Sequence, residues 1–288
     1  MADDLENLQS AAYTVGASRA LTSSIAIHVD GVYNRMSKVP MTIDINPRSG
    51  GTTGNRPLPQ FARVLQAQSI GFMNYKALLV RLEKRLDRHY MYLVSYTLSG
   101  SNGNVNNSGG TQSVVTDSAH INYDQGPNNS DRLHTLVASG SVLVPGDVTL
   151  GGVFSYRSTM PFSAIAGVDV NGDGNVTDYV PGTARSVFNR GDDGTMLQAV
   201  NAWRAVNNLP AISPTFSTNE FLSFDLRASK AISLTSGRRV ELIGQVFNLF
   251  NRKNILAAWT TNALSPAFGT STSAAPMRQA EIAARFTF

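Results

Sequence analysis

The sequence predicts an all-β chain whose antiparallel strands form a segment of a transmembrane β-barrel. First, apolar side chains occupy every second position of the last ten residues, 279–288, which indicates a strand with one apolar and one polar face. Ten residues also match the length that a tilted membrane-spanning strand needs, about 9–11. Second, similar segments recur along the chain, and the connections between them are alternately short and long.

Composition excludes several classes of protein. Of the 288 residues, 42% are hydrophobic, which is enough for a folded structure. The chain has no cysteine, so it has neither disulfides nor thiolate metal sites. The net charge is +4, but Lys and Arg are scattered, and we expect no nucleic-acid partner. No apolar run could form a transmembrane helix and no signal peptide follows Met1, so we expect the natural N-terminus to lie upstream.

Four strands are predicted in the first half of the chain. Their ranges are 11–20, 24–34, 75–86 and 90–99. In the third of these, Leu78, Val80 and Leu82 point to one face. Arg81 and Glu83 point to the other face. Burying these charges in a dry core would be costly, whereas a water-filled barrel interior accommodates them.

Five more strands and one helix are predicted in the second half. The strands are 132–144, 148–158, 221–230, 239–250 and 279–288, which gives about nine strands in all. The helix is expected at 195–208, inside a long connection, because Met196, Val200 and Trp203 recur near helical spacing.

The connection lengths orient these strands. The short connections are 21–23, 87–89, 145–147 and 233–238, and the long ones are 35–74, 100–131, 159–219 and 251–278. Outer-membrane barrels combine short periplasmic turns with longer extracellular loops. We therefore expect the last strand to end in the periplasm.

Six segments carry a family pattern. They are 74–85, 95–99, 131–134, 167–174, 226–230 and 246–252, and the last, Val-Phe-Asn-Leu-Phe-Asn-Arg, is the most specific. These segments resemble the C-terminal barrel of TonB-dependent outer-membrane receptors, particularly the Oar-like group. The aromatic chain end, Phe286 and Phe288, resembles the signal that the barrel-assembly machinery reads.

The resemblance implies a location, a function and partners. Transporters of this type have about 22 strands and a plugged lumen, so residues 1–288 would form the C-terminal part of an incomplete barrel, without the plug domain and the N-terminal strands. The resemblance also implies energy-coupled uptake of an extracellular ligand across the bacterial outer membrane. The implied partners are outer-membrane lipid, the barrel-assembly machinery and, through the missing N-terminal part, the TonB complex.

An acidic loop is a candidate metal site. Asp169, Asn171 and Asp173 place oxygen ligands at positions 1, 3 and 5, and a glycine follows at position 6, as in loops that wrap Ca²⁺. Val180 at position 12 departs from the EF-hand pattern, and Asp178 is the substitute ligand. The alternative is a solvated turn rich in Asp, Asn and Gly.

Two other functions remain open, an adhesion or interaction platform and a hydrolase at the barrel rim. For the hydrolase, His120, Asp124, Asp131 and His134 are the residues that could converge, although polar residues in loops ordinarily stabilise a rim. The chain contains no Gly-x-Ser-x-Gly, no His-Glu-x-x-His and no phosphate-binding loop. We therefore expect no enzymatic activity and no cofactor other than Ca²⁺.

Overall fold

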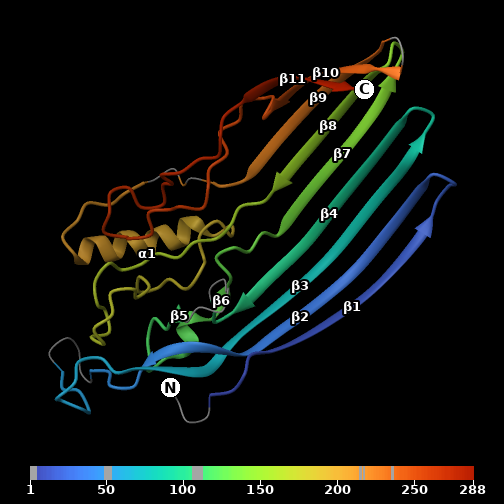
Figure 1. Cartoon of the computed structure of the whole chain (residues 1–288). Helices are drawn as coiled ribbons and strands as arrows, with labels where there is room; N and C mark the ends of the chain where they lie inside the picture. Colours follow the sequence, from blue (N-terminus) through green and yellow to red (C-terminus); the bar gives the residue numbers. More distant parts are fainter. Residues whose placement is uncertain (1–4, 49–53, 106–112, 214–215, 217, 235–236) are drawn as a thin grey trace.

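A single antiparallel sheet runs through the chain in the computed structural model (Figure 1). The structure describes residues 5–48, 54–105, 113–213, 216, 218–234 and 237–288, so parts of four predicted connections, at 49–53, 106–112, 214–217 (except 216) and 235–236, lie outside the described residues. The long strands are β1 (Gln9–Ala20), β2 (Ile25–Asp44), β3 (Leu65–Asp87), β4 (Tyr90–Gly103), β7 (His134–Val144), β8 (Val148–Arg157), β9 (Phe221–Ser233), β10 (Arg239–Phe247) and β11 (Gln279–Thr287).

The strands follow one another in chain order across the sheet, β1-β2-β3-β4-β7-β8-β9-β10-β11. Two short strands lie off this path: β5 (Ser113–Val114) pairs with β2, and β6 (Gly126–Pro127) pairs with β4. The sheet is open, because β1 and β11 are its two edges. This arrangement confirms the predicted all-β, antiparallel and incomplete fold. In the described part of the chain, no helix is long and apolar enough to cross a membrane.

The predicted ends of β2 and β3 were wrong. The loop predicted at 35–74 is shorter in the structure, because β2 continues to Asp44 and β3 begins at Leu65. The register shifts between Ser37 and Met41, and Lys38 has a positive φ of 56°. This bulge accommodates Pro40, which would otherwise interrupt the hydrogen-bond ladder.

Strand register separates the sheet into an apolar face and a polar face. Leu226 lies opposite Gly152 and Val246, and Leu78 lies opposite Gly31 and Leu98. The apolar face carries Tyr13, Val15, Tyr33, Leu78, Val80, Leu82, Leu98, Tyr156, Phe224, Leu226, Ile282 and Phe286. The apolar residues that the alternation predicts in β3, β9 and β11 therefore share one face across the sheet.

The polar face carries the charges. His28 Nε2 lies 3.6 Å from Glu83 Oε1, and Arg81 Nη2 lies 3.6 Å from Glu83 Oε2. Across the other half of the sheet, Arg227 and Arg285 each lie 3.7 Å from Glu241. These pairs are partly exposed and contribute little stability, but they show that this face suits water.

The two ends of the sheet differ (Figure 1). The short turns and the C-terminus lie at one end, the turn end, and the long connections with helix α1 (Asp193–Val206) lie at the other, the loop end. The predicted helix at 195–208 is thus confirmed with a shift of two residues. Helix η1 (Ile121–Asp124) lies in the connection between β4 and β7.

The loops at this end form a layer with hydrophobic cores of its own. The larger core includes Phe162, Phe188 and Phe268, whose rings lie 4.9–5.9 Å apart by centroid. Trp203 of α1 and Trp259 pack against it. The smaller core joins Met41 of β2 to Val105 and Val115. Long polar connections therefore fold into a packed layer, the loop layer, at the loop end of the sheet.

Candidate functional site in the loop layer

A pocket of about 560 Å³ opens between two of the long connections. The first connection, between β4 and β7, contributes Asp117, His120 and Tyr123. The second, between β8 and β9, contributes Asn171, Asp178 and Tyr179. The pocket combines carboxylates, an imidazole and phenol rings, a set that can both hydrogen-bond and stack on a ligand.

Asp117 and His120 form a pair at the pocket wall. His120 Nδ1 lies 2.9 Å from Asp117 Oδ2, and the imidazole stacks on Tyr123 with ring centroids 5.2 Å apart. Burial raises the pKa of Asp117, but hydrogen bonds from His120, the Ala119 amide and the Asn171 side chain outweigh it and leave that pKa below its ordinary value. Asp117 therefore presents a stable negative charge beside an exposed imidazole.

Arg185 joins the segments next to this pocket by hydrogen bonds. Its side chain is 1% exposed, and its guanidinium donates to the carbonyl oxygens of Gly103, Val105 and Asp124. The Asp124 carboxylate in turn accepts hydrogen bonds from Thr116 and from the Tyr179 hydroxyl. Burial, together with the charge of Asp124, raises the pKa of Tyr179. Sequence reasoning missed Arg185 because an isolated Arg in a loop gives no periodic signal.

The acidic loop folds as a tight turn stabilised by its own carboxylates. Asp169 accepts hydrogen bonds from the amides of Gly172 and Gly174, and Asp178 accepts one from Val170. Gly172 and Gly174 have φ of 81° and 93°, values that glycine adopts freely. The tight turn that the sequence predicts for this loop is thus present.

Two carboxyl groups of the turn have raised pKa values. Burial raises the pKa of Asp173, and the charge of Asp169 adds to it. Burial also raises the pKa of Asp178, with contributions from Asp173 and Asp169. Within the described ranges, however, no three His, Asp or Glu side chains converge closely enough to hold a metal ion. Calcium binding by Asp169, Asn171, Asp173 and Asp178 stays a prediction.

The four candidate residues for a rim hydrolase have separate partners. His120 bonds Asp117, whereas Asp124 accepts from Thr116 and Tyr179. Asp131 pairs with Arg190, and His134 Nδ1 lies 2.8 Å from the Tyr96 hydroxyl. Each side chain stabilises a different contact of the rim, in line with the structural role that polar loop residues ordinarily have.

The aromatic chain end lies at the turn end of the sheet. Phe286 is on the apolar face of β11, and Phe288 follows one residue after that strand. The two rings stack with centroids 5.9 Å apart, and Phe288 is 95% exposed. Both rings are therefore available for recognition.

The family of the chain is shown by a match that covers nearly all of it. Residues 1–281 match the model of the "Outer membrane beta barrel domain" family. The chain belongs to this family. Its apolar face is accordingly the lipid face of an outer-membrane barrel, its polar face lines the interior, and the protein resides in the bacterial outer membrane. No curated protein matches the chain.

Solved structures include a similar fold. The crystal structure of the outer membrane transporter YddB from Escherichia coli aligns with a TM-score of 0.59 and 10% sequence identity. The alignment covers 99% of this chain and 33% of that chain. The chain thus spans about a third of the length of this transporter, and the likeness concerns the fold.

Proposed function

We propose that the chain forms the C-terminal barrel wall of a TonB-dependent outer-membrane receptor that takes up an extracellular ligand. The observation that carries this proposal is the alignment of the whole open sheet with one third of an outer membrane transporter. An open sheet leaves unpaired backbone groups at β1 and β11, and each such group costs several kcal/mol in hydrocarbon. Further strands from the same receptor would satisfy both edges.

The loop layer is the part of the barrel wall that would meet the ligand. Its pocket lies at the loop end, and Asp117, His120 and Tyr179 supply polar contacts from two connections. The polar face below it carries ion pairs such as Arg227 with Glu241, which suit a hydrated path. We propose binding and passage, without a chemical reaction, as the role of this site.

Uptake by the intact receptor tests this proposal. Cells that carry the full-length receptor would be grown in complex medium, with and without the inner-membrane TonB protein, and depletion of medium components would be followed by mass spectrometry. We expect at least one compound to be depleted only when both proteins are present. His120→Ala should slow its depletion, whereas Asp192→Ala, at the exposed start of α1, should not.

The upstream coding sequence gives a second test. A plug domain and a TonB box before the segment described here support the receptor, and their absence would contradict it.

A packed loop layer also favours one alternative, an adhesion or interaction platform. The aromatic core around Phe162 and Phe188 holds the loop layer in one conformation, so its outer surface has a defined shape. In that case cells would bind a surface or a partner protein equally well with and without TonB, and no compound would be depleted from the medium.

A further inference from the structure

The loop end of the lipid face carries two cations among apolar side chains. Lys76 lies opposite Tyr33 and Gly100, and Arg35 lies opposite Ala11 and Asn74. By the alternation of strand residues, Lys76 shares the face of Leu78, and Arg35 shares the face of Tyr33. Both side chains are exposed. Because they are diagonal neighbours on β2 and β3, their head groups can reach one ligand.

Neither cation is neutralised by a carboxylate within the described residues. Nearby Lys38, by contrast, pairs with Glu6 at 2.7 Å. The contact found for Lys76 is with an aromatic ring, because its Nζ lies 6.0 Å from the centroid of Tyr33. A charge in this position is costly beside hydrocarbon unless it meets an anion or the interface. The two cations therefore point to an anionic partner at the membrane boundary.

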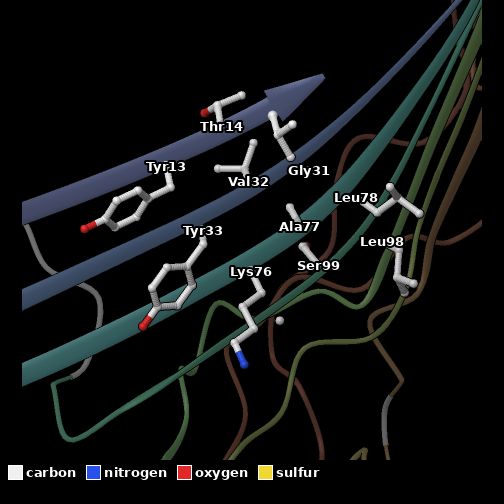
Figure 2. A pocket seen from close by; sticks show the side chains of 12 residues that line it. Tyr13, Thr14, Gly31, Val32, Tyr33, Lys76, Ala77, Leu78, Leu98 and Ser99 are labelled. Atoms are coloured by element: carbon white, nitrogen blue, oxygen red, sulfur yellow. The ribbon is translucent and has the colours of Figure 1, made fainter. Parts of the chain in front are cut away.

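A groove of about 640 Å³ begins beside Lys76. Its base is flat because Gly31 and Gly100 have no side chains, and at Gly100 a Cβ atom would meet nothing within 4 Å. Leu78 and Leu98 line the part nearer the turn end, so the groove is charged at one extremity and apolar along the rest. Figure 2 shows Lys76 on one side of the groove and the two leucines farther along the strands.

Two tyrosines mark the membrane boundary at the same level. Tyr13 and Tyr33 stack with ring centroids 6.3 Å apart, and the Tyr33 hydroxyl donates to Asn74 at 3.2 Å. Figure 2 shows Tyr13, Tyr33 and Lys76 in succession on three neighbouring strands. Tyrosines form girdles at both interfaces of outer-membrane barrels. The cations thus lie where lipid head groups meet acyl chains in the outer leaflet.

We propose that Lys76 and Arg35 bind the phosphate of an outer-leaflet lipid, and that an acyl chain of the same lipid occupies the groove over Gly31 and Gly100. The occupant is a phosphorylated glycolipid of the outer leaflet, because an amphiphile with an anionic head group satisfies both the cations and the apolar groove. A Lys ammonium and an Arg guanidinium together suit a phosphate, since both donate charge-assisted hydrogen bonds to its oxygens.

The experiment uses the full-length receptor purified in a zwitterionic detergent. Lipid A and enzymatically dephosphorylated lipid A are the two probes, and bound lipid is counted by native mass spectrometry across a titration. The test variant is Arg35→Gln with Lys76→Gln. The control is Lys230→Gln, because Lys230 is also exposed on the lipid face but lies near the turn end, opposite Val148 and Leu242.

We expect the double variant to bind lipid A about 25-fold more weakly, at about fivefold for each charge at a membrane surface. Lys230→Gln should bind as the parent does, and dephosphorylated lipid A should bind the parent about as weakly as lipid A binds the double variant. Heat-modifiable migration on a gel checks that each variant is folded. Gly31→Leu, which fills the groove, should weaken binding while both cations remain.

Three results would overturn the proposal. The first is equal binding of lipid A by the parent and the double variant. The second is equal binding of the phosphorylated and dephosphorylated lipids, which would mean that the groove holds acyl chains without regard to the head group. The third is protein dimers in the mass spectra that the double substitution removes, which would assign the surface to a second copy of the chain.

Discussion

Arg190 Nη2 lies 2.9 Å from Asp131 Oδ2 and joins two loops that are 59 residues apart in the chain. The Asp131 side chain is 5% exposed and also accepts a hydrogen bond from the Ser101 amide at the end of the sheet. Burial raises the pKa of Asp131, although the charge of Arg190 and the Ser101 hydrogen bond act in the opposite direction. This pair connects the loop layer to β4.

Loss of Arg190 should loosen the loop layer. Arg190→Ala leaves a buried carboxylate without its charged partner, and we expect a loss of about 3 kcal/mol in the free energy of unfolding. Thermal unfolding of the full-length receptor in detergent measures this loss. Arg238→Ala, at an exposed position near the turn end, is the control. Equal melting temperatures for the two variants would contradict a structural role of the pair.

Asp131→Asn should cost less than Arg190→Ala, because its amide oxygen still accepts from Ser101 and the Arg190 guanidinium keeps its hydrogen bonds to backbone carbonyl oxygens. The raised pKa of Asp131 also predicts how stability changes with pH, and thermal unfolding at several pH values measures this change. A carboxyl group with a folded pKa above its ordinary value of 3.8 stabilises the fold when protonated, and this contribution is lost as pH rises from 3.8 through the folded pKa. Stability of the parent should fall across that window relative to Asp131→Asn, and parallel pH profiles would contradict the assignment.

The two faces of the sheet should differ in their tolerance of charge. Leu226 faces lipid and Ser229 faces the interior. Leu226→Arg should cost about 2–4 kcal/mol if it lies at the midplane, whereas Ser229→Arg should cost much less. Reversible folding of the receptor into lipid vesicles, followed by tryptophan fluorescence, measures both. Equal costs would mean that the faces are assigned wrongly.

The acidic turn should bind Ca²⁺ weakly, at about millimolar affinity, as extracellular calcium modules do. Titration calorimetry on the intact receptor measures the affinity, and the double variant Asp169→Asn, Asp173→Asn should abolish the heat. Asp192→Asn is the control. Because Asp173 and Asp178 have raised pKa values, protons compete with the ion, and affinity should fall as pH decreases through those values. An unchanged heat in the double variant would leave only a hydrogen-bonded turn.

Phe288 should act in assembly and not in stability. Its ring is 95% exposed, so Phe288→Ala removes no buried contact. We expect less receptor in the outer-membrane fraction but an unchanged melting temperature of the receptor that does assemble. Ile282→Ala is a matched control, because Ile282 is 94% exposed on β11, the strand that Phe288 follows. If both variants assemble as well as the parent, the aromatic end is not the recognition signal.

The sequence predicted the strands well where one face is lipid and the other is water. Alternation in β3, β9 and β11 is a local property, so Leu78, Leu226 and Ile282 could be assigned to one face without a structure. The extension of β2 to Asp44 could not be predicted in this way. Beyond Ser37 the strand packs against Val105 and Val115 of the loop layer, and Pro40 gives the local signal of a loop.

The candidate site could be predicted only in part, because its local turn is visible in the sequence but its pocket is not. The Asp169–Asp173 spacing is visible in the sequence, and the turn that it forms is present. The pocket beside it depends on contacts between distant residues, such as Asn171 with Asp117 and Arg185 with Gly103. Hydrogen bonds of this kind follow from tertiary packing, and neither composition nor periodicity predicts them.

The aromatic core of the loop layer has a thermodynamic consequence for ligand recognition. Ordering a loop costs about 1–2 kcal/mol of free energy for each residue fixed. Loops that become ordered only on binding therefore bind more weakly than loops that are already ordered. Here the stacked rings of Phe162 and Phe188 and the buried Arg204 already hold the connections in place. A ligand would therefore meet a preorganised surface, and its association would carry a small conformational-entropy cost for the loops and proceed with little rearrangement of the backbone.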